Sequence, residues 1–413
     1  MSTDRAPGLP YSAPALTEHG GAYAYLVARP PAAGHGALAG VRLAVKDLIS
    51  IRGYPMRAGS KARQSAVPET TTAPVVARLL ERGASLIGAT TLHEFAFGVT
   101  GVNDHAGTPA NPRDPRCIPG GSSSGSAVAV AEGSADLAVG TDTGGSVRIP
   151  AALCGVVGFK PAYGSYPVDG VYPLAPSLDH VGLLARTVSV VVRAHTALTG
   201  QRPSPADRLR IGLLRAELDD ADPLVSESVA LVADVLARSG HTVCELPWLD
   251  PQDVFEASTT LLLAEAARVH RAAIVGGALD RYGADVRERL LRGAAVDAVA
   301  ETAARRVQDR LCRLARERFG AVDCVIGPTV PVLAPRLDDA WQATIAARLV
   351  RNTRAANLVG LPAVTLPLPG PGLPIGLQIC AASNVAVLGA AQRIAPLLAA
   401  ADPSVARRSG GTR

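Results

Sequence analysis

The chain has 413 residues, of which 48% are hydrophobic, and a formal net charge of +5. This apolar content is ample for a core, whereas so small a charge, carried by scattered arginines, argues against nucleic-acid binding. The sequence has no run of eighteen apolar residues and no apolar signal core near its start, so we expect no membrane association and a cytoplasmic location.

The domain organisation predicted from the sequence is simple. No linker rich in proline, glycine or charge divides the middle of the chain, so we expect one large domain at residues 21–405. Residues 1–20, broken by Ala-Pro and Leu-Pro steps, are predicted to be a mobile tail, and residues 406–413 a polar C-terminal tail. The six cysteines are widely spaced and the eight histidines lack metal-ligand spacing. We therefore expect no metal and no cofactor.

The first informative element is an apolar, strand-like run at residues 43–49, which contains Lys46. Only two other lysines, Lys61 and Lys160, occur in a chain that otherwise takes its positive charge from arginine. Arginine cannot be deprotonated, whereas a buried lysine amine can lose its proton and act as a base. The alternative is a structural lysine that reaches out from the strand end or pairs with Asp47.

A second informative region begins with a Gly/Ser loop at residues 119–126. A helix of small residues, a buried strand at residues 135–140 and a Gly-rich turn at residues 141–150 follow it. A helix of about eleven residues is roughly 16 Å long and a strand of about six residues roughly 20 Å. A chain that runs up the helix and returns along the strand therefore brings Ser146 beside Ser122.

Three other interpretations of the Gly/Ser loop are less consistent with the sequence. A flexible linker would not lead directly into an ordered helix. A phosphate-binding loop requires a lysine where this chain has Ser126. A nucleophile elbow centred on Ser123 must follow a strand and use a late histidine, yet residues 111–119 are typical of turns and the last histidine is His270.

The remainder of the chain alternates between the two periodicities. We predict strands at residues 209–214, 241–246, 322–328, 363–368 and 375–380. Helices are predicted at residues 224–239, 254–276 and 296–319. This interleaving favours an α/β architecture.

Residues 119–161 resemble the signature of the amidase signature family of serine hydrolases. The resemblance covers roughly residues 38–400 and includes the motifs at residues 92–98, 111–112, 177–182, 357–364 and 373–378. It implies a mixed many-stranded β-sheet with helices on both faces. It also implies an amidase that hydrolyses a carboxylic amide, such as a small primary amide, to an acid and ammonia through an acyl-serine.

The resemblance also implies roles for individual residues. Ser146 matches the nucleophile, Ser122 the bridging serine that follows a cis peptide bond, and Lys46 the base. Backbone N–H groups of a Gly-rich turn can converge on one oxygen, so we assign the oxyanion hole to Thr143, Gly144, Gly145 and Ser146. The charged residues Asp142, Arg148 and Asp179 are expected to be supports, and Ser123 a hydrogen-bonding residue of the loop.

The substrate is less well defined by the sequence. Met56, Phe95, Phe97 and Tyr172 are candidates to line an acyl pocket, or else belong to the core. The expected partner is a small-molecule amide, with a homodimer left open. The sequence departs from the family in its short N-terminal region, in Ser124 where glycine is common and in Met56 where threonine is frequent. Two alternatives stay open: the catalytic A-type subunit of a glutamyl-tRNA amidotransferase-like complex, and a catalytically inactive binding or biosynthetic protein.

Overall fold

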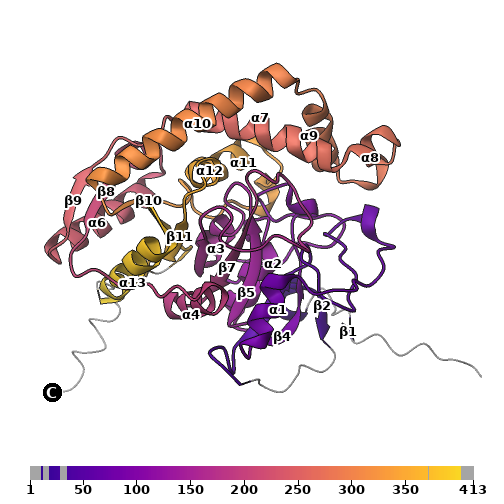
Figure 1. The fold of residues 1–413 in the computed structure, drawn as a ribbon, viewed down its shortest axis with the longest axis horizontal. Coiled ribbons are helices and arrows are strands. Elements are labelled where there is room, and N and C mark those ends of the chain that lie inside the picture. The colour runs from indigo at the N-terminus through magenta and orange to yellow at the C-terminus, as the bar shows by residue number, and fades with distance from the viewer. Residues whose placement is uncertain (1–10, 13–17, 28–34, 371, 401–413) are drawn as a thin grey trace, which may run out of the picture.

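The computed structural model of the protein describes residues 11–12, 18–27, 35–370 and 372–400. The tails predicted at residues 1–20 and 406–413 lie mostly outside these ranges. Within them, twelve strands form one sheet (Figure 1). In spatial order the strands are β1 (Tyr11–Ser12), β2 (Tyr23–Val27), β4 (Ser85–Thr90), β3 (Arg42–Lys46), β5 (Leu137–Asp142), β7 (His180–Ala185), β6 (Val157–Lys160), β11 (Ala363–Pro367), β12 (Gly376–Ala381), β10 (Cys324–Pro328), β8 (Arg210–Leu213) and β9 (Thr242–Glu245).

The sheet is mixed. Strands β4, β3 and β5 are parallel neighbours, as are β10, β8 and β9, while the other neighbouring pairs are antiparallel. The pairing of Val45 with Val139 aligns β3 and β5 so that both strands end at the same edge of the sheet. The side chains at these strand ends, including those of Lys46 and Thr141, therefore lie close together.

Helices cover both faces of the sheet, which confirms the predicted architecture (Figure 1). The described helices are α1 (Pro74–Glu81), α2 (Ser124–Glu132), α3 (Arg148–Cys154), α4 (Val188–Thr199), α5 (Arg215–Asp219), α6 (Pro223–Arg238), α7 (Pro251–Val269), α8 (Arg271–Val275), α9 (Ala284–Ala294), α10 (Ala298–Ala321), α11 (Ala343–Val350), α12 (Arg354–Leu358) and α13 (Asn384–Ala400).

Two sets of apolar contacts hold these layers together. Helices α1, α4, α6 and α13 bury their apolar sides on one face of the sheet, against the large aliphatic residues of its strands. On the other face, α2 and α3 pack through small side chains such as Ala127 and Ala151 against Ala44 and Ala138. Small residues let these two helices approach the sheet closely. A Cβ at Gly125 of α2 would lie 2.3 Å from the carbonyl oxygen of Ala22.

One predicted helix is interrupted. The helix expected at residues 254–276 is divided into α7, which ends at Val269, and α8, which begins at Arg271, with His270 between them. The His270 ring is buried there, 4.7 Å from the ring of Phe95, and its Nδ1 lies 3.1 Å from the Tyr282 hydroxyl. Burial of this ring against another segment fixes the chain direction at the break.

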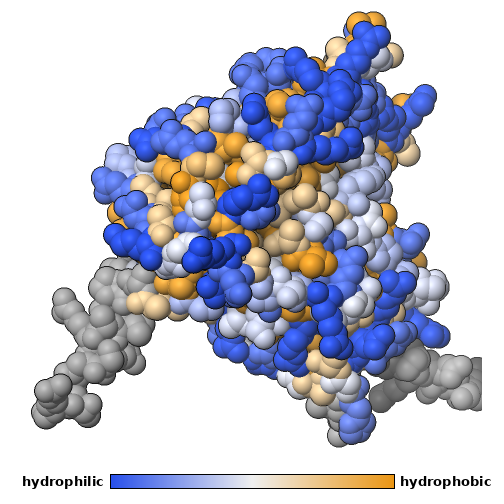
Figure 2. Space-filling view, turned by 60° about the vertical axis from the view of Figure 1, so that its left-hand side comes forward, coloured by the Kyte–Doolittle hydropathy of each residue, from blue (hydrophilic) through white to orange (hydrophobic). Residues whose placement is uncertain are grey.

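On the face seen in Figure 2, apolar residues gather in a central region that hydrophilic residues surround. Across the described ranges, the structure contains no helix that is both long enough and apolar enough to cross a membrane.

Candidate active site

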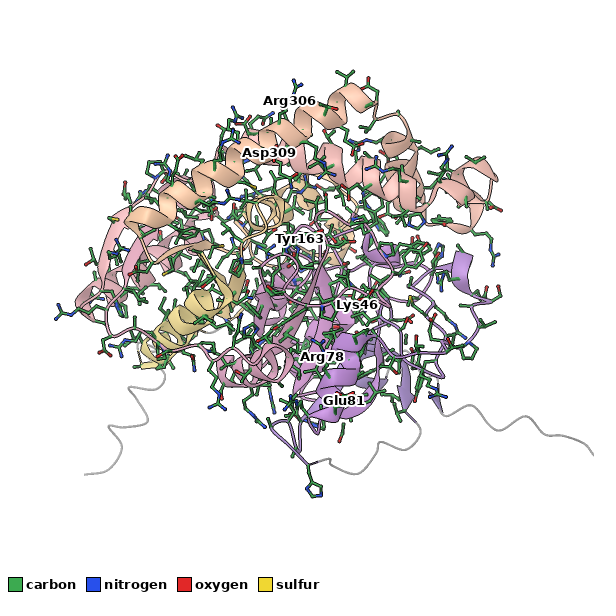
Figure 3. All side chains as sticks on the ribbon, in the orientation of Figure 1. Lys46, Arg78, Glu81, Tyr163, Arg306 and Asp309 are labelled. Carbon is green, nitrogen blue, oxygen red and sulfur yellow. The ribbon has the colours of Figure 1, made fainter. Side chains whose placement is uncertain are left out.

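Lys46 ends β3 in the interior of the protein, and its side chain is fully buried (Figure 3). Its Nζ donates to three hydroxyl oxygens: Ser122 Oγ at 2.8 Å, Thr141 Oγ1 at 2.8 Å and Ser123 Oγ at 3.1 Å. Lys46 therefore does not reach out to solvent, which was the structural alternative. Thr141, at the end of the neighbouring strand, is a contact that the sequence analysis did not anticipate.

The surroundings of Lys46 favour the neutral, deprotonated form of its amine. Burial lowers the pKa of Lys46 from 10.5 to about 7, although the carboxylates of Asp142 and Asp179 oppose this shift. Burial penalises the charged ammonium because the apolar interior solvates it poorly. Neutral amine is therefore abundant near pH 7, and a hydroxyl group lies within hydrogen-bonding distance of it.

The loop before α2 carries Ser122 and Ser123. The peptide bond between Gly121 and Ser122 is cis, as the family resemblance implies. The carbonyl of Ser122 accepts from the backbone N–H of His93 at 3.1 Å, and the Ser123 hydroxyl donates to the Thr141 carbonyl at 3.1 Å. The first bond joins the loop to the segment that follows β4 and the second joins it to β5, with the Ser122 hydroxyl against Lys46.

A direct backbone contact joins this loop to the Gly-rich turn that follows β5. The Ser123 N–H donates to the carbonyl oxygen of Ser146 at 3.1 Å. The structure thus brings the two segments together, as the lengths of the predicted helix and strand required. The segments that contain Lys46, Ser122 and Ser146 thus meet from three separate parts of the sequence.

The buried carboxylate of Asp142 organises the turn that contains Ser146. Its oxygens accept from the backbone N–H groups of Gly145 at 2.8 Å and Val147 at 3.1 Å. Burial alone would raise its pKa, but the adjacent Arg148 guanidinium outweighs that effect and holds the pKa well below its usual range. Asp142 is therefore charged at neutral pH and fixes the turn from inside.

Arg148, the first residue of α3, has a fully buried side chain whose bonds join the turn to the C-terminal part of the chain. It forms an ion pair with Asp142 at 3.0 Å and donates to Gln378 Oε1 at 2.7 Å and to the Thr353 carbonyl at 2.9 Å. Asn357 completes the group by donating to Oδ1 and to the backbone carbonyl oxygen of Asp142, each at 2.9 Å. Both charged groups thus have several partners, as buried ions require.

The predicted oxyanion hole needs one correction. The Gly145 N–H already donates to Asp142, so it is not available to a substrate oxygen. The N–H groups of Thr143, Gly144 and Ser146 remain candidate donors. Gly145 has another role: its φ of +128° suits glycine, and a Cβ there would lie 2.3 Å from Thr353 Oγ1.

A cavity of about 430 Å³ opens beside this turn. Thr143, Gly144 and Ser146 form one wall, and residues of α7, α9 and α11 form the others. Of the four predicted pocket residues, Phe97 lines this cavity. Tyr172 lines a smaller cavity of about 210 Å³ that also reaches Thr143.

For Phe95 and Met56 the structure corrects the prediction, since neither lines these two cavities. The Phe95 ring is buried in an apolar cluster and stacks on Tyr282 with ring centres 5.0 Å apart. Met56 is buried too, and its carbonyl accepts from Arg63 Nε at 2.8 Å. Both residues therefore belong to the packed interior of the protein.

The sequence analysis missed two residues that border the turn from the C-terminal part of the chain. The Thr353 hydroxyl donates to the Gly144 carbonyl at 2.7 Å. Arg354 lines the large cavity, and its Cγ would be 3.7 Å from a Cβ at Gly144. No local pattern marks these residues, because more than two hundred positions separate them from the turn.

Comparisons with known proteins identify the family of the chain. The sequence matches the Amidase family over residues 22–384. It is 37% identical to 2-amino-5-chloromuconic acid deaminase from Comamonas testosteroni, covering 83% of this chain and 78% of that protein. It is 34% identical to indoleacetamide hydrolase from Pseudomonas savastanoi, covering 82% and 79%. Its fold matches the crystal structure of the A-type subunit of glutamyl-tRNA(Gln) amidotransferase from Thermotoga maritima with a TM-score of 0.81 and 27% identity, covering 94% and 89%.

The chain therefore belongs to the amidase family, as the resemblance of residues 119–161 predicted. It is an amidohydrolase, and its substrates are small-molecule amides.

Proposed function

We propose that this chain cleaves a primary amide to a carboxylic acid and ammonia, with Ser146 as nucleophile, Ser122 as proton relay and Lys46 as base. The observation that carries the proposal is the 2.8 Å contact between a fully buried Lys46 Nζ and the Ser122 hydroxyl. The similarity to indoleacetamide hydrolase, which is named for a primary amide, supports this class of substrate.

In the proposed mechanism, neutral Lys46 takes a proton from Ser122 as Ser122 takes one from Ser146. The Ser146 oxygen attacks the amide carbon, and the N–H groups of Thr143, Gly144 and Ser146 stabilise the negative oxygen that forms. The C–N bond then breaks as Ser122 gives a proton to the leaving nitrogen and recovers one from Lys46. Water cleaves the acyl-serine through the same relay, which releases the acid and restores the serine.

A second candidate function is that of an A-type subunit in an amide-transfer complex. The structural match to the corresponding subunit of glutamyl-tRNA(Gln) amidotransferase, with 89% of that chain covered, favours it. Such a protein would pass ammonia to a partner, whereas an independent amidase releases ammonia by itself.

One experiment tests both candidates. The purified chain is incubated with a panel of primary amides, without ATP or partner proteins, and ammonia is measured. We expect steady ammonia release by the native chain and a loss of about 10⁴-fold or more for Ser146→Ala. Ammonia release only after a partner is added would favour the transfer function.

Labelling by a serine-directed phosphonate provides a second measurement. Ser146→Ala should abolish labelling while the melting temperature stays close to that of the native chain. Labelling that persists in the variant and maps to Ser123 would overturn the assignment of the nucleophile and favour the elbow interpretation.

A further inference from the structure

The large cavity beside Ser146 contains five charged side chains, and four of them form two ion pairs. Arg289 lies 2.8 Å from Asp285, which also contacts His93, and Arg292 lies 3.9 Å from Glu288. Each of these pairs brings opposite charges together within α9. The fifth charged side chain, Arg354, has no oppositely charged partner of this kind.

Within the described ranges, no acidic side chain pairs with Arg354. Its NH1 donates to the Thr259 hydroxyl at 2.5 Å, and its guanidinium lies over the Phe255 ring at 4.8 Å. Burial and the nearby Arg289 lower the pKa of Arg354 to about 10, so the group stays positively charged at neutral pH.

This arrangement places an uncompensated positive charge beside the proposed oxyanion turn. The Arg354 Nε would be 3.9 Å from a Cβ at Gly144, which lies two residues before Ser146. Arg354 is partly buried where it lines the cavity, and a negative group would compensate the cost of that burial, whereas the hydroxyl and ring contacts carry no charge. A carboxylate matches the planar, forked geometry of the guanidinium.

We propose that Arg354 binds a carboxylate of the substrate, so that the preferred substrates are short amides that also carry a free carboxylate. This inference rests on the proposed hydrolysis at Ser146. The acid product would then be a dicarboxylate, and a neutral amide of the same size would leave Arg354 unpaired in the complex.

The test compares matched pairs of substrates. One member of each pair is a primary amide whose other end is a carboxylate, with about one to four methylene groups between the two groups. The other member keeps the primary amide but has a methyl ketone, of the same shape and without charge, in place of the carboxylate. The ratio of kcat/KM within a pair is measured from ammonia release for the native chain and for Arg354→Gln. Arg292→Gln is the matched control, because it also removes an arginine from the cavity but one that is paired with Glu288.

We expect the native chain to prefer the carboxylate member of the best pair by about 30-fold or more, as for other charge-assisted hydrogen bonds. Arg354→Gln should reduce this ratio to about twofold, and Arg292→Gln should preserve it. The absence of a preference in the native chain would overturn the proposal. An equal loss on both members in Arg354→Gln, with a lowered melting temperature, would show that Arg354 only braces α12 against α7.

Binding to Ser146→Ala separates this inference from the proposed reaction. Calorimetry with this variant should show that the carboxylate amide binds at least about tenfold more tightly than the ketone, and that Arg354→Gln in the same background removes the difference. This result does not depend on turnover. A chain that releases no ammonia but binds the carboxylate selectively would retain the Arg354 site and refute only the hydrolysis.

Discussion

The burial of Lys46 predicts how the activity depends on pH. Burial lowers the pKa of this amine from 10.5 to about 7, against the opposing effect of the Asp142 and Asp179 carboxylates. The proposed base must be neutral to accept a proton from Ser122. The value of kcat/KM should therefore rise with pH through this range and level off above it.

The size of the effect follows from the fraction of neutral amine. An amine with a pKa of about 7 is about 10% neutral at pH 6 and about 90% neutral at pH 8, so kcat/KM should rise almost tenfold between them. A lysine with its ordinary pKa would be neutral in about 0.3% of molecules at pH 8. Its activity would continue to rise toward about pH 10.

The assay measures ammonia release from a neutral primary amide between about pH 5 and pH 10, so that the substrate itself does not titrate. Lys46→Arg and Lys46→Ala should both lose about 10³-fold, because arginine retains the charge but cannot supply a neutral base. Melting temperatures of the two variants control for folding. A rise of kcat/KM centred near pH 10, or near-native activity of Lys46→Arg, would refute the assignment of Lys46 as the base.

Two further predictions concern the relay and the turn. Ser122→Ala should slow the acylation by an amide at least about tenfold more than that by a matched activated ester, because only the amine leaving group needs a proton. Single-turnover rates test this, and equal losses would mean that Ser122 does not serve the leaving group. Gly145→Ala should destabilise the fold by about 2 kcal/mol or more, since φ is +128° and the new Cβ would lie 2.3 Å from Thr353 Oγ1. Gly144→Ala is the matched control, because its Cβ meets Arg354 only at 3.7 Å, and similar melting temperatures for the two variants would contradict this account of the turn.

The sequence predicted several strands of the sheet, although not β1, β2, β4, β6 or β7, and it did not predict the breaks between helices. Strands such as β8 and β10 are short apolar runs between turn signals, and these local features are sufficient to identify them. The break between α7 and α8 depends instead on the burial of the His270 ring against Phe95. That contact joins segments far apart in the sequence, and the local pattern contains no sign of it.

The same distinction applies to the site. Lys46, Ser122 and Ser146 could be proposed from the sequence, because each lies in a short motif that resembles the family signature. The engagement of the Gly145 N–H by Asp142 could not, since it depends on the direction in which one peptide of the turn points. The sequence also could not show which aromatic candidates line the cavity. Phe95 and Phe97 are two residues apart, yet Phe95 packs in the interior and Phe97 lines the cavity.

The two buried lysines show that a lowered pKa does not by itself identify a catalytic base. Lys46 and Lys160 are both fully buried, and burial lowers the pKa of each to about 7. Lys160 donates to the carbonyl oxygens of Pro161 and Leu361, which have no proton to give in return. Lys46 contacts hydroxyl groups, which donate as well as accept, and two of them belong to the loop that is bonded to the carbonyl of Ser146. A buried amine can serve as a base only where a neighbour has a proton to transfer, and of these two lysines Lys46 alone meets that condition.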